Sequence, residues 1–397
     1  MRRHLLAGWV LLVGTAAALA AGPPALGPGV PDFTVRPGYR VTVAADHLEE
    51  ARCMALDDRG TLYVSQIGHG QVVALSDLNA QDEYQKEQVY LRHQKFVHGL
   101  CWHDGWLWFA PSTAIGRARG HKPDGSAAEV QMILTGLPGN SGHLWRSLLV
   151  TDQGFYTSVG DPGNITDQSH TDREKIWFYH LDGTGKTLFA SGIRNTEKLR
   201  LRPGTQEVWG CDQGSDNFGQ RYGEEAGREQ PITDDLPPDE FNHYVAGGFY
   251  GHPFLVGNRI PRPEYQDRKD LVELATKTIV PAWSLGAHWA PDAFCFVSLT
   301  NRKFPPDHRG DAFIACHGSW NSSVKVGYRI QRILFDNVTG KPYGSLCIVS
   351  TLGPQGQVLG RPVDCVEAPD GTILFSVDAP RPRIYRISWI GTGSGAR

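Results

Sequence analysis

One short pattern recurs along the chain and limits the folds that the sequence can adopt. Each copy is a turn that holds Asp or Pro together with Gly, followed by an apolar or aromatic strand. The copies are Leu56–Val64, His103–Phe109, Thr151–Thr157, Arg202–Trp209, Arg309–Ala315 and Ala368–Phe375. The early copies lie about 50 residues apart, a period typical of propellers and solenoids. Further alternating strands flank each copy, so the repeat predicts an all-β fold, a six-bladed β-propeller.

The spacing is interrupted once, between the fourth and fifth copies. The residues from Phe218 to Leu274 are rich in charge, Pro and Gly. We expect an insertion here that covers one face of the propeller, although a degenerate seventh blade would also fit the gap. Helix is sparse in this sequence, and Lys269–Lys277 is the best short candidate.

The composition agrees with a large, turn-rich β protein. Among 397 residues, 40% are apolar, 46 are Gly and 26 are Pro, which is unlike a disordered chain or a helical bundle. The 39 Lys and Arg are balanced by 42 Asp and Glu. This balance argues against nucleic acid as a partner, because non-specific binding to it needs a basic surface.

The N-terminus has the pattern of an export signal. Arg2 and Arg3 precede an apolar run from Leu5 to Leu19, and Ala18–Ala20 is a small-x-small cleavage site. The run is too short for a secure membrane span. We therefore expect a signal peptide at 1–20, a linker at 21–33, the propeller at 34–390 and a tail at 391–397. The expected location is the periplasm or the outside of the cell.

The seven cysteines are an odd number, so at least one thiol stays free. We expect small core residues with one to three disulfide bridges, because an exported chain can form them. No C-x-x-C occurs, so neither a zinc knuckle nor an attached haem is encoded.

A candidate site begins at Ser191–Thr196 and continues at Trp209–Asp216. The first stretch holds Arg194 and Asn195 behind a Gly, and the second is a strand that ends in Asp-Gln-Gly. A fixed cation, an amide and exposed backbone carbonyls suit an anionic cofactor and a hard metal ion. The alternative is an ordinary surface turn, because Gly and Asn are common in turns.

Two histidines and an arginine extend this candidate site. His143 stands before the third repeat strand, and Asp161 follows that strand; a His near neutral pH is a natural general base, and an Asp can orient it. His317 stands just after the fifth repeat strand, and Arg361 stands just before the last repeat. A histidine that is merely hydrogen-bonded in its loop is an equally good interpretation of each His alone. Dinucleotide, P-loop and serine-hydrolase motifs are absent from the sequence.

Taken in order, these motifs resemble a known family. The series is His143-x-x-Arg146, Gly192-x-Arg-Asn195, Trp209–Gly214, Asp235–Glu240, Gly248–Gly251, Gly286–Pro291, His317–Asn321 and Gly360–Pro362. It resembles the pyrroloquinoline-quinone-dependent sugar dehydrogenases, most of all the sorbosone/pyranose dehydrogenase branch, and more distantly the soluble glucose dehydrogenases. The resemblance runs from about Thr34 to Trp389 and implies a six-bladed propeller.

The resemblance also implies roles for individual residues. His143 matches the base that removes the substrate hydroxyl proton, and Asp161 matches its carboxylate neighbour. The residues that match cofactor-binding groups are Arg194, Asn195, Gln213, His317 and Arg361. Gly214 and Ser215 fall where backbone oxygens hold Ca²⁺, and Ser215 stands where this branch usually has Arg.

The expected function is therefore oxidation of a sugar or a related alcohol or aldehyde, by hydride transfer to pyrroloquinoline quinone with Ca²⁺. The electrons would leave to a separate acceptor, a cytochrome or a quinone. Two alternatives remain open at this point. One is a Ca²⁺-dependent lactone hydrolase on a similar propeller, with a carboxylate and Asn cage around the metal. The other is a propeller that binds glycans or proteins without catalysis.

Overall fold

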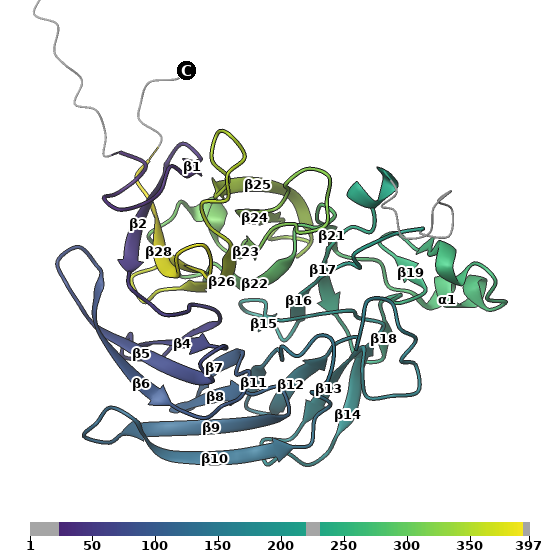
Figure 1. Cartoon of the computed structure of the whole chain (residues 1–397), viewed down its shortest axis with the longest axis horizontal. Coiled ribbons are helices and arrows are strands. Elements are labelled where there is room, and N and C mark those ends of the chain that lie inside the picture. The colour runs from purple at the N-terminus through teal and green to yellow at the C-terminus, as the bar shows by residue number, and fades with distance from the viewer. Residues whose placement is uncertain (1–23, 220–230, 392–397) are drawn as a thin grey trace, which may run out of the picture.

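Six β-sheets surround a central axis in the computed structural model, which describes residues 24–219 and 231–391 (Figure 1). The first strands of neighbouring sheets touch in a closed ring, in the order β3, β7, β11, β15, β22, β26 and back to β3. The predicted six-bladed propeller is thus confirmed, and the alternative of a degenerate seventh blade is wrong.

Three sheets come from the first half of the chain, except for one added strand of the third sheet, β18. The first consists of β3 (Met54–Leu56), β4 (Leu62–Gln66), β5 (Gln71–Leu78) and β6 (Tyr84–Leu91). The second consists of β7 (Gly99–His103), β8 (Trp106–Ala110), β9 (Ala114–His121) and β10 (Ala127–Thr135). The third consists of β11 (Leu149–Thr151), β12 (Gly154–Val159), β13 (Lys175–Tyr179), β14 (Thr187–Ser191) and the parallel β18 (Gly248–Phe249).

The other three sheets follow, and two of them take a strand from the N-terminal segment. The fourth consists of β15 (Leu199–Leu201), β16 (Val208–Asp212), β17 (Glu240–Tyr244) and β21 (Trp283–Ser284). The fifth consists of β22 (Pro291–Phe296), β23 (Ala312–Cys316), β24 (Arg329–Phe335), β25 (Pro342–Ser350) and β1 (Thr34–Val35). The sixth consists of β26 (Pro362–Glu367), β27 (Ile373–Val377), β28 (Arg383–Trp389) and β2 (Tyr39–Ala45).

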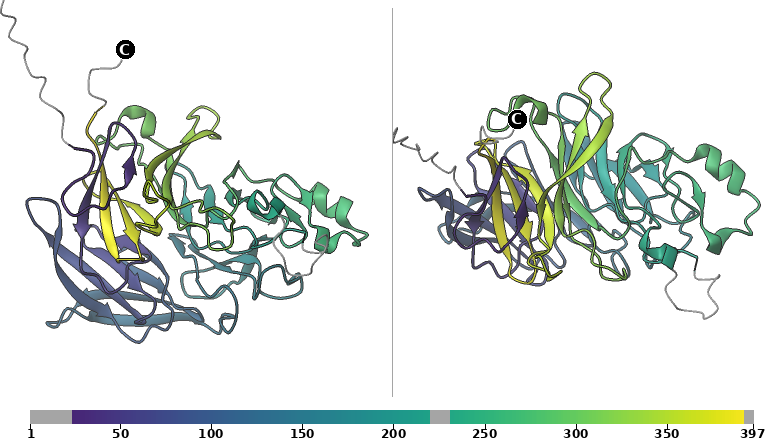
Figure 2. Two further views of the ribbon diagram at one scale, coloured as in Figure 1. Left: turned by 45° about the horizontal axis from the view of Figure 1, so that its top comes forward. Right: turned by 90° about the horizontal axis from the view of Figure 1, so that it is seen from above.

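The segment between the fourth and fifth repeats does more than cover a face. It supplies β17 and β21 of the fourth sheet and β18 of the third. Its remaining elements are η2 (Pro231–Asp234), β19 (Leu255–Val256), β20 (Ile260–Pro261), η3 (Pro263–Tyr265) and α1 (Leu271–Lys277); a further 3-10 turn, η4 (Pro306–His308), precedes β23. Helix α1 confirms the candidate at Lys269–Lys277, and it projects from one side of the ring (Figure 2). That the segment is an insertion stays a prediction.

Burial explains why these segments are strands. Second strands such as β4, β8 and β27 are buried along their whole length, since neighbouring sheets cover both of their faces. The outermost strand β10 instead alternates between exposed and half-buried residues, because only one face packs inward. The core therefore lies between adjacent sheets, as where Phe375 and Ile387 of the sixth pack with Phe313 and Ile330 of the fifth.

The N-terminal segment closes the ring. Strand β2 pairs with β28 in antiparallel register, with Val41 opposite Ile387, so the two ends of the described chain share one sheet. Radial closure of this kind leaves few free sheet edges. Residues 24–33, expected to be part of a linker, lie against this sheet: Gly27 N donates to Val41 O at 2.8 Å, and Phe33 is buried in the core. The signal peptide expected at 1–20 and nearly all of the tail expected at 391–397 fall outside the described residues.

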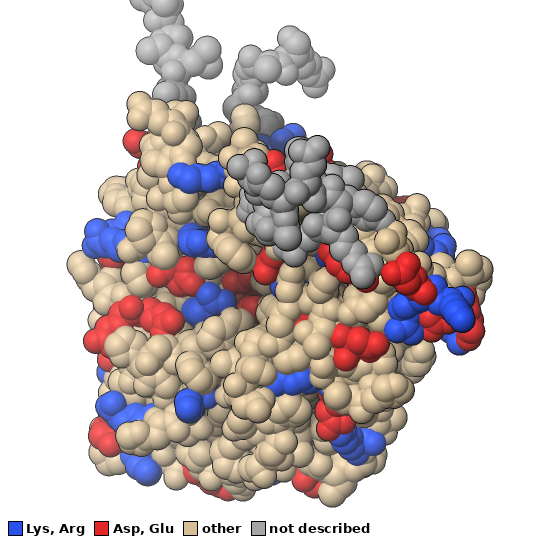
Figure 3. All heavy atoms as spheres, turned by 45° about the vertical axis from the view of Figure 1, so that its right-hand side comes forward, with Lys and Arg blue, Asp and Glu red and all other residues tan. Residues whose placement is uncertain are grey.

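The prediction of one to three disulfide bridges is wrong. All seven cysteines are free, six of them buried and Cys347 half-buried. They act as small apolar core residues, as the first part of that expectation had it. Among the described residues, no helix has the length and apolar character needed to cross a membrane. Lys, Arg, Asp and Glu are intermingled over the face drawn in Figure 3, in keeping with the near-neutral charge.

Substitution of a core isoleucine tests the packing between sheets. Ile387 is fully buried opposite Val41, whereas Ile260 of β20 is 37% exposed. We expect Ile387→Ala to lower the free energy of unfolding by about 2–5 kcal/mol, since it leaves a cavity between the fifth and sixth sheets. Ile260→Ala serves as the matched control, with a change of about 0.5 kcal/mol or less. Equal effects in denaturant titrations would contradict this packing.

Candidate active site

The predicted site residues lie on one face of the propeller because of the strand order. In an antiparallel four-stranded sheet, the loop after the second strand and the loop after the fourth strand lie at the same end. Asp161, Gln213 and His317 follow the second strands β12, β16 and β23, whereas His143 and Arg194 follow the last strands β10 and β14. The recurring Gly turns join first to second strands, so they lie on the opposite face.

His143 is held as a neutral base. Its Nδ1 lies 2.8 Å from the main-chain oxygen of Asp161. A carbonyl only accepts, so Nδ1 carries the proton and Nε2 keeps a free lone pair. Burial, together with the positive charge of Arg194, lowers the pKa of His143 to about 4. The imidazole is therefore uncharged at neutral pH and able to take a proton.

The position of His143 depends on close contacts between loops. Gly142 has φ +64°, and a Cβ there would lie 2.5 Å from Asp161 O. A Cβ on Gly160 would lie 2.8 Å from the Cβ of His143 and from Arg194 O. The fully buried Arg146 fixes the same loop, because its guanidinium donates to Ser112 O at 2.9 Å and to His143 O at 3.2 Å. Side chains larger than Gly at 142 or 160 would force these loops apart.

Asp161 serves His143 through its backbone and not through its carboxylate, which corrects the predicted arrangement. The carboxylate accepts hydrogen bonds from Gly163 N at 2.5 Å and Thr166 N at 2.9 Å, and it lies 2.9 Å from His252 Nε2. Burial would raise the pKa of Asp161, but His252 and the two amides outweigh it and lower the pKa to about 2. The charged side chain thus shapes the loop whose carbonyl orients the imidazole.

Arg194 and Asn195 lie next to this base. Asp161 N donates to Arg194 O at 2.9 Å, and the guanidinium of Arg194 donates to Asn164 and to Gly214 O at 2.8 Å. The backbone N–H groups of Arg194 and Asn195 donate to the carboxylate of Asp212, at 2.9 and 2.7 Å. Arg194 is 5% exposed, so a buried positive charge is fixed beside His143.

The predicted metal ligands lie under this guanidinium. Gly214 O accepts from Arg194, and Gln213 O lies 3.5 Å from the same nitrogen. The hydroxyl oxygen of Ser215 accepts a hydrogen bond from the buried guanidinium of Arg262. A guanidinium therefore lies at Ser215 although the residue itself is not Arg.

A group of charged side chains on the axis belongs to none of the sequence motifs that predict the site. Arg52, from the loop after β2, donates to Asp378 at 2.6 Å and to Asp292 at 3.1 Å, and lies 3.4 Å from Glu197. Burial would lower the pKa of Arg52, but these carboxylates raise it, so the guanidinium stays charged. His98 lies 3.2 Å from Glu197 and stacks on Trp145.

This axial group connects the predicted cofactor residues. Gln213 donates to Asp292 at 2.6 Å, and Asn195 donates to Glu197 and to Gln213, both at 2.9 Å. His317 lies 3.0 Å from Asp378, and the backbone of Arg361 pairs with that of residues 378 and 379. The structure thus brings the predicted residues together around one axis; of these, Ser215 turns its side chain away toward Arg262.

Sequence comparison points to one family. A family model described as TrAA12-like matches residues 33–347. A curated relative, an uncharacterized protein of Borreliella burgdorferi, is 30% identical over 203 residues, which make up 50% of this chain and 48% of that protein. The chain thus matches about half the length of that relative.

Solved structures share the fold. The holo form of the pyranose dehydrogenase PQQ domain from Coprinopsis cinerea is 19% identical with a TM-score of 0.75, covering 92% of this chain and 100% of that one. A calcium structure of the AA12 protein of Trichoderma reesei is 19% identical with a TM-score of 0.74, covering 92% and 98%. The apo soluble aldose sugar dehydrogenase of Escherichia coli is 16% identical with a TM-score of 0.63, covering 88% and 99%. At these identities the likeness establishes the fold alone.

The protonation state of His143 is open to direct measurement. Its pKa lies below the ordinary value of 6.5, so we expect the ring to stay neutral as the pH falls to 5 and to gain a proton only near pH 4. Histidine ring signals in NMR, assigned by comparison with His143→Gln, report this directly on the cofactor-free protein. A titration midpoint of 6 to 7, as for an exposed imidazole, would contradict the assigned environment.

Proposed function

Because this chain belongs to the TrAA12-like family, we propose that it is a quinoprotein that oxidises a sugar, or a related alcohol or aldehyde, with pyrroloquinoline quinone. One observation carries the proposal: His143 is a neutral imidazole whose Nδ1 is held by Asp161 O, and burial together with the buried charge of Arg194 lowers its pKa to about 4. Oxidation of an alcohol removes the proton of the hydroxyl group and a hydride from the carbon that bears this group. Such a reaction needs a base for the proton and a fixed cation for the charge that develops on oxygen. The names of two structural neighbours, a pyranose dehydrogenase PQQ domain and an aldose sugar dehydrogenase, agree with this class.

The residues at the axis fit a flat anionic quinone. The Nε atoms of Arg361 and Arg52 are buried and have no hydrogen-bond partner among the described residues, and such donors suit carboxylates. Arg194, Asn195, Gln213, His317 and Arg361 would hold the group. When bound, it supplies the electrophilic carbon that accepts a hydride from the substrate.

In the mechanism we propose, His143 Nε2 accepts the proton of the substrate hydroxyl. The Asp161 carbonyl keeps Nδ1 in place and stabilises the imidazolium that forms. Arg194 lowers the pKa of His143, so the proton is passed on readily to solvent. Arg194 also offers fixed positive charge where negative charge develops on oxygen. A positioned base of this kind contributes about 10²- to 10⁴-fold to the rate.

We assign Ca²⁺ to the backbone oxygens of Gly214 and Ser215. Carbonyl oxygens are ligands that Ca²⁺ prefers. Gly214 O accepts one hydrogen bond from Arg194 and has a second lone pair, and Asp216 lies 3.6 Å from the same guanidinium. The ion would supply Lewis acidity beside Arg194.

The chain would pass its electrons to a separate acceptor, a cytochrome or a quinone, because its sequence has no C-x-x-C-H haem motif. We take residues 1–20 as an export signal, which would direct the protein to the periplasm or to the outside of the cell.

The lactone-hydrolase alternative receives less support from the geometry. It needs a metal position walled by carboxylate and Asn side chains. The carboxylates on the axis, those of Glu197, Asp292 and Asp378, instead surround the guanidinium of Arg52. All three carboxylates therefore already contact an arginine, which offsets part of their charge.

Reconstitution with quinone and Ca²⁺ tests the proposal. We expect the wild-type protein to bind the quinone, seen as a change in its visible absorption, and to reduce a dye with aldoses as substrates. His143→Gln should lower kcat by about 10²- to 10⁴-fold, because the base is lost, while quinone binding stays nearly unchanged. Arg194→Gln should instead weaken quinone binding.

His170→Gln is the matched control, since His170 is exposed and should keep wild-type kinetics. A wild-type rate in His143→Gln would remove His143 as the base. No quinone binding and no dye reduction by the wild-type protein with any aldose would contradict the enzymatic proposal and leave a non-catalytic propeller.

A further inference from the structure

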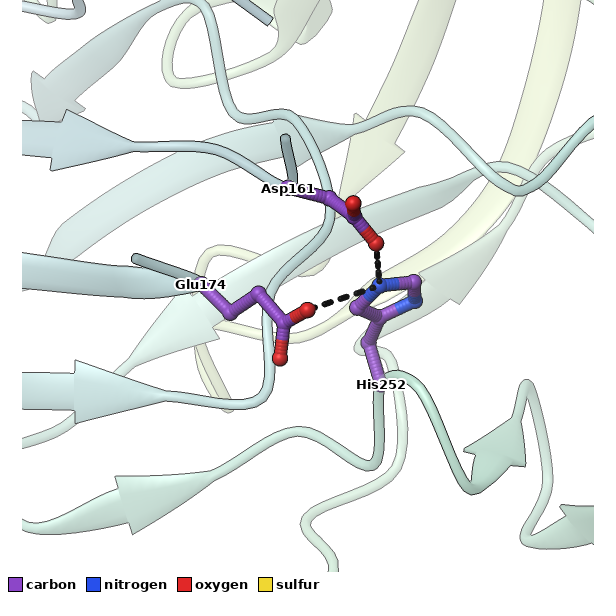
Figure 4. Close-up of side chains that lie close together, drawn as sticks. All are labelled: Asp161, Glu174 and His252. Carbon is purple, nitrogen blue, oxygen red and sulfur yellow. Dashed lines mark hydrogen bonds and ion pairs between the residues drawn. The ribbon is translucent and has the colours of Figure 1, made fainter. Parts of the chain in front are cut away.

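Three buried side chains converge behind the candidate active site (Figure 4). Asp161 and Glu174 begin and end the loop between β12 and β13, and His252 follows β18. Their side chains are 0%, 4% and 8% exposed. Asp161 Oδ2, Glu174 Oε1 and His252 Nε2 all lie within 4.8 Å of one another. Both carboxylates point toward the same imidazole nitrogen.

The one proton that His252 Nε2 can carry does not satisfy both carboxylates. Asp161 Oδ2 lies 2.9 Å from this nitrogen, at hydrogen-bonding distance, whereas Glu174 Oε1 lies 3.6 Å away. Glu174 Oε1 is buried and has no hydrogen-bond partner among the described residues. A buried carboxylate oxygen without a partner is costly, so this atom points to a missing cation.

The two cationic residues on either side of Glu174 in the sequence make their hydrogen bonds to other groups. Arg173 donates to Gly160 O and to Asn140, both at 3.2 Å. Lys175 Nζ lies within 3.4 Å of four main-chain oxygens of residues 168 to 173. Even with His252 protonated, the three groups carry one net negative charge in a buried place. With His252 neutral, the charge of the two carboxylates equals that of a divalent ion.

We propose that Asp161, Glu174 and His252 bind a divalent transition-metal ion of the zinc or manganese class. The ion takes the place of the proton on His252 Nε2 and is bound by one oxygen of each carboxylate. With metal–ligand bonds of about 2.1 Å, neighbouring ligand atoms lie roughly 3 to 3.5 Å apart. The separations of 2.9 and 3.6 Å already approach this geometry.

The donor set separates this site from a calcium site. Ca²⁺ takes oxygen ligands, whereas imidazole combined with carboxylates suits zinc, manganese or iron. The site is therefore distinct from the Ca²⁺ position assigned to Gly214 and Ser215, and the proposal does not depend on quinone chemistry.

The ion would act as a positioning element for the base. Asp161 binds it through the side chain and orients His143 through the main-chain oxygen, 2.8 Å from Nδ1. Metal binding would fix both ends of the loop from Asp161 to Glu174. Ligands that hold a loop in this way stabilise the folded state, because the unfolded chain offers no preformed site.

Titration with Co²⁺ of the cofactor-free, chelator-treated full chain tests the proposal, since bound Co²⁺ gives visible ligand-field bands. We expect one equivalent to bind and the Tm to rise. Glu174→Gln keeps the shape of the side chain and removes its charge, so it should weaken Co²⁺ binding by about tenfold to a hundredfold or more and make the Tm rise smaller at the same Co²⁺ concentration.

His103→Gln is the matched control. His103 lies 3.2 Å from Asp152, and this histidine–carboxylate pair has no third candidate ligand among the described residues, so its loss should leave Co²⁺ binding unchanged. A second measurement needs no variant: elemental analysis of the wild-type protein should find one chelator-removable divalent transition metal. Absence of Co²⁺ binding by the wild-type protein, or equal binding by Glu174→Gln, would show that the three residues form only an ion pair.

Discussion

The arrangement of the whole site depends on one buried guanidinium. Arg52 is shared by Glu197, Asp292 and Asp378, which come from loops or strands of three different sheets. Each carboxylate in turn holds one predicted cofactor residue: Glu197 holds Asn195, Asp292 holds Gln213 and Asp378 holds His317. Loss of one partner from such a buried group typically costs about 3–5 kcal/mol, because a charge is left without compensation. Ion pairs near the axis thus connect residues from three sheets of the propeller.

A second constraint is the close approach of three loops around His143. Gly142 and Gly160 allow the backbone of one loop to touch the next, so that a main-chain oxygen and not a carboxylate orients the imidazole. Arg194 adds positive charge at close range and helps to keep the base neutral. The same loop turns the Asp161 carboxylate to the other side, toward Glu174 and His252. One short segment therefore joins the candidate active site to the proposed metal site.

The fold was predictable because its signal is local. Each repeat is one turn and one strand within about ten residues, and six copies suffice to indicate a propeller. The ordered motifs also included His143, Arg194 and Gln213, which the structure has on one face. The partners of Arg52 were not predictable, since Arg52 and Asp378 are separated by 326 residues and neither stands in a motif. The disulfides were expected from export alone, but burial keeps the thiols as core residues. The role of Asp161 was misassigned because sequence does not tell a main-chain contact from a side-chain contact.

We propose that loops from separate blades form one site for a flat quinone, between an imidazole and a guanidinium. A crystal structure of the full chain with pyrroloquinoline quinone and Ca²⁺ tests this most directly. We expect quinone density on the axial face, within hydrogen-bonding distance of Arg194 and with His143 Nε2 facing its ring. Quinone bound on the opposite face, among the recurring Gly turns, or no density at saturating quinone, would contradict it.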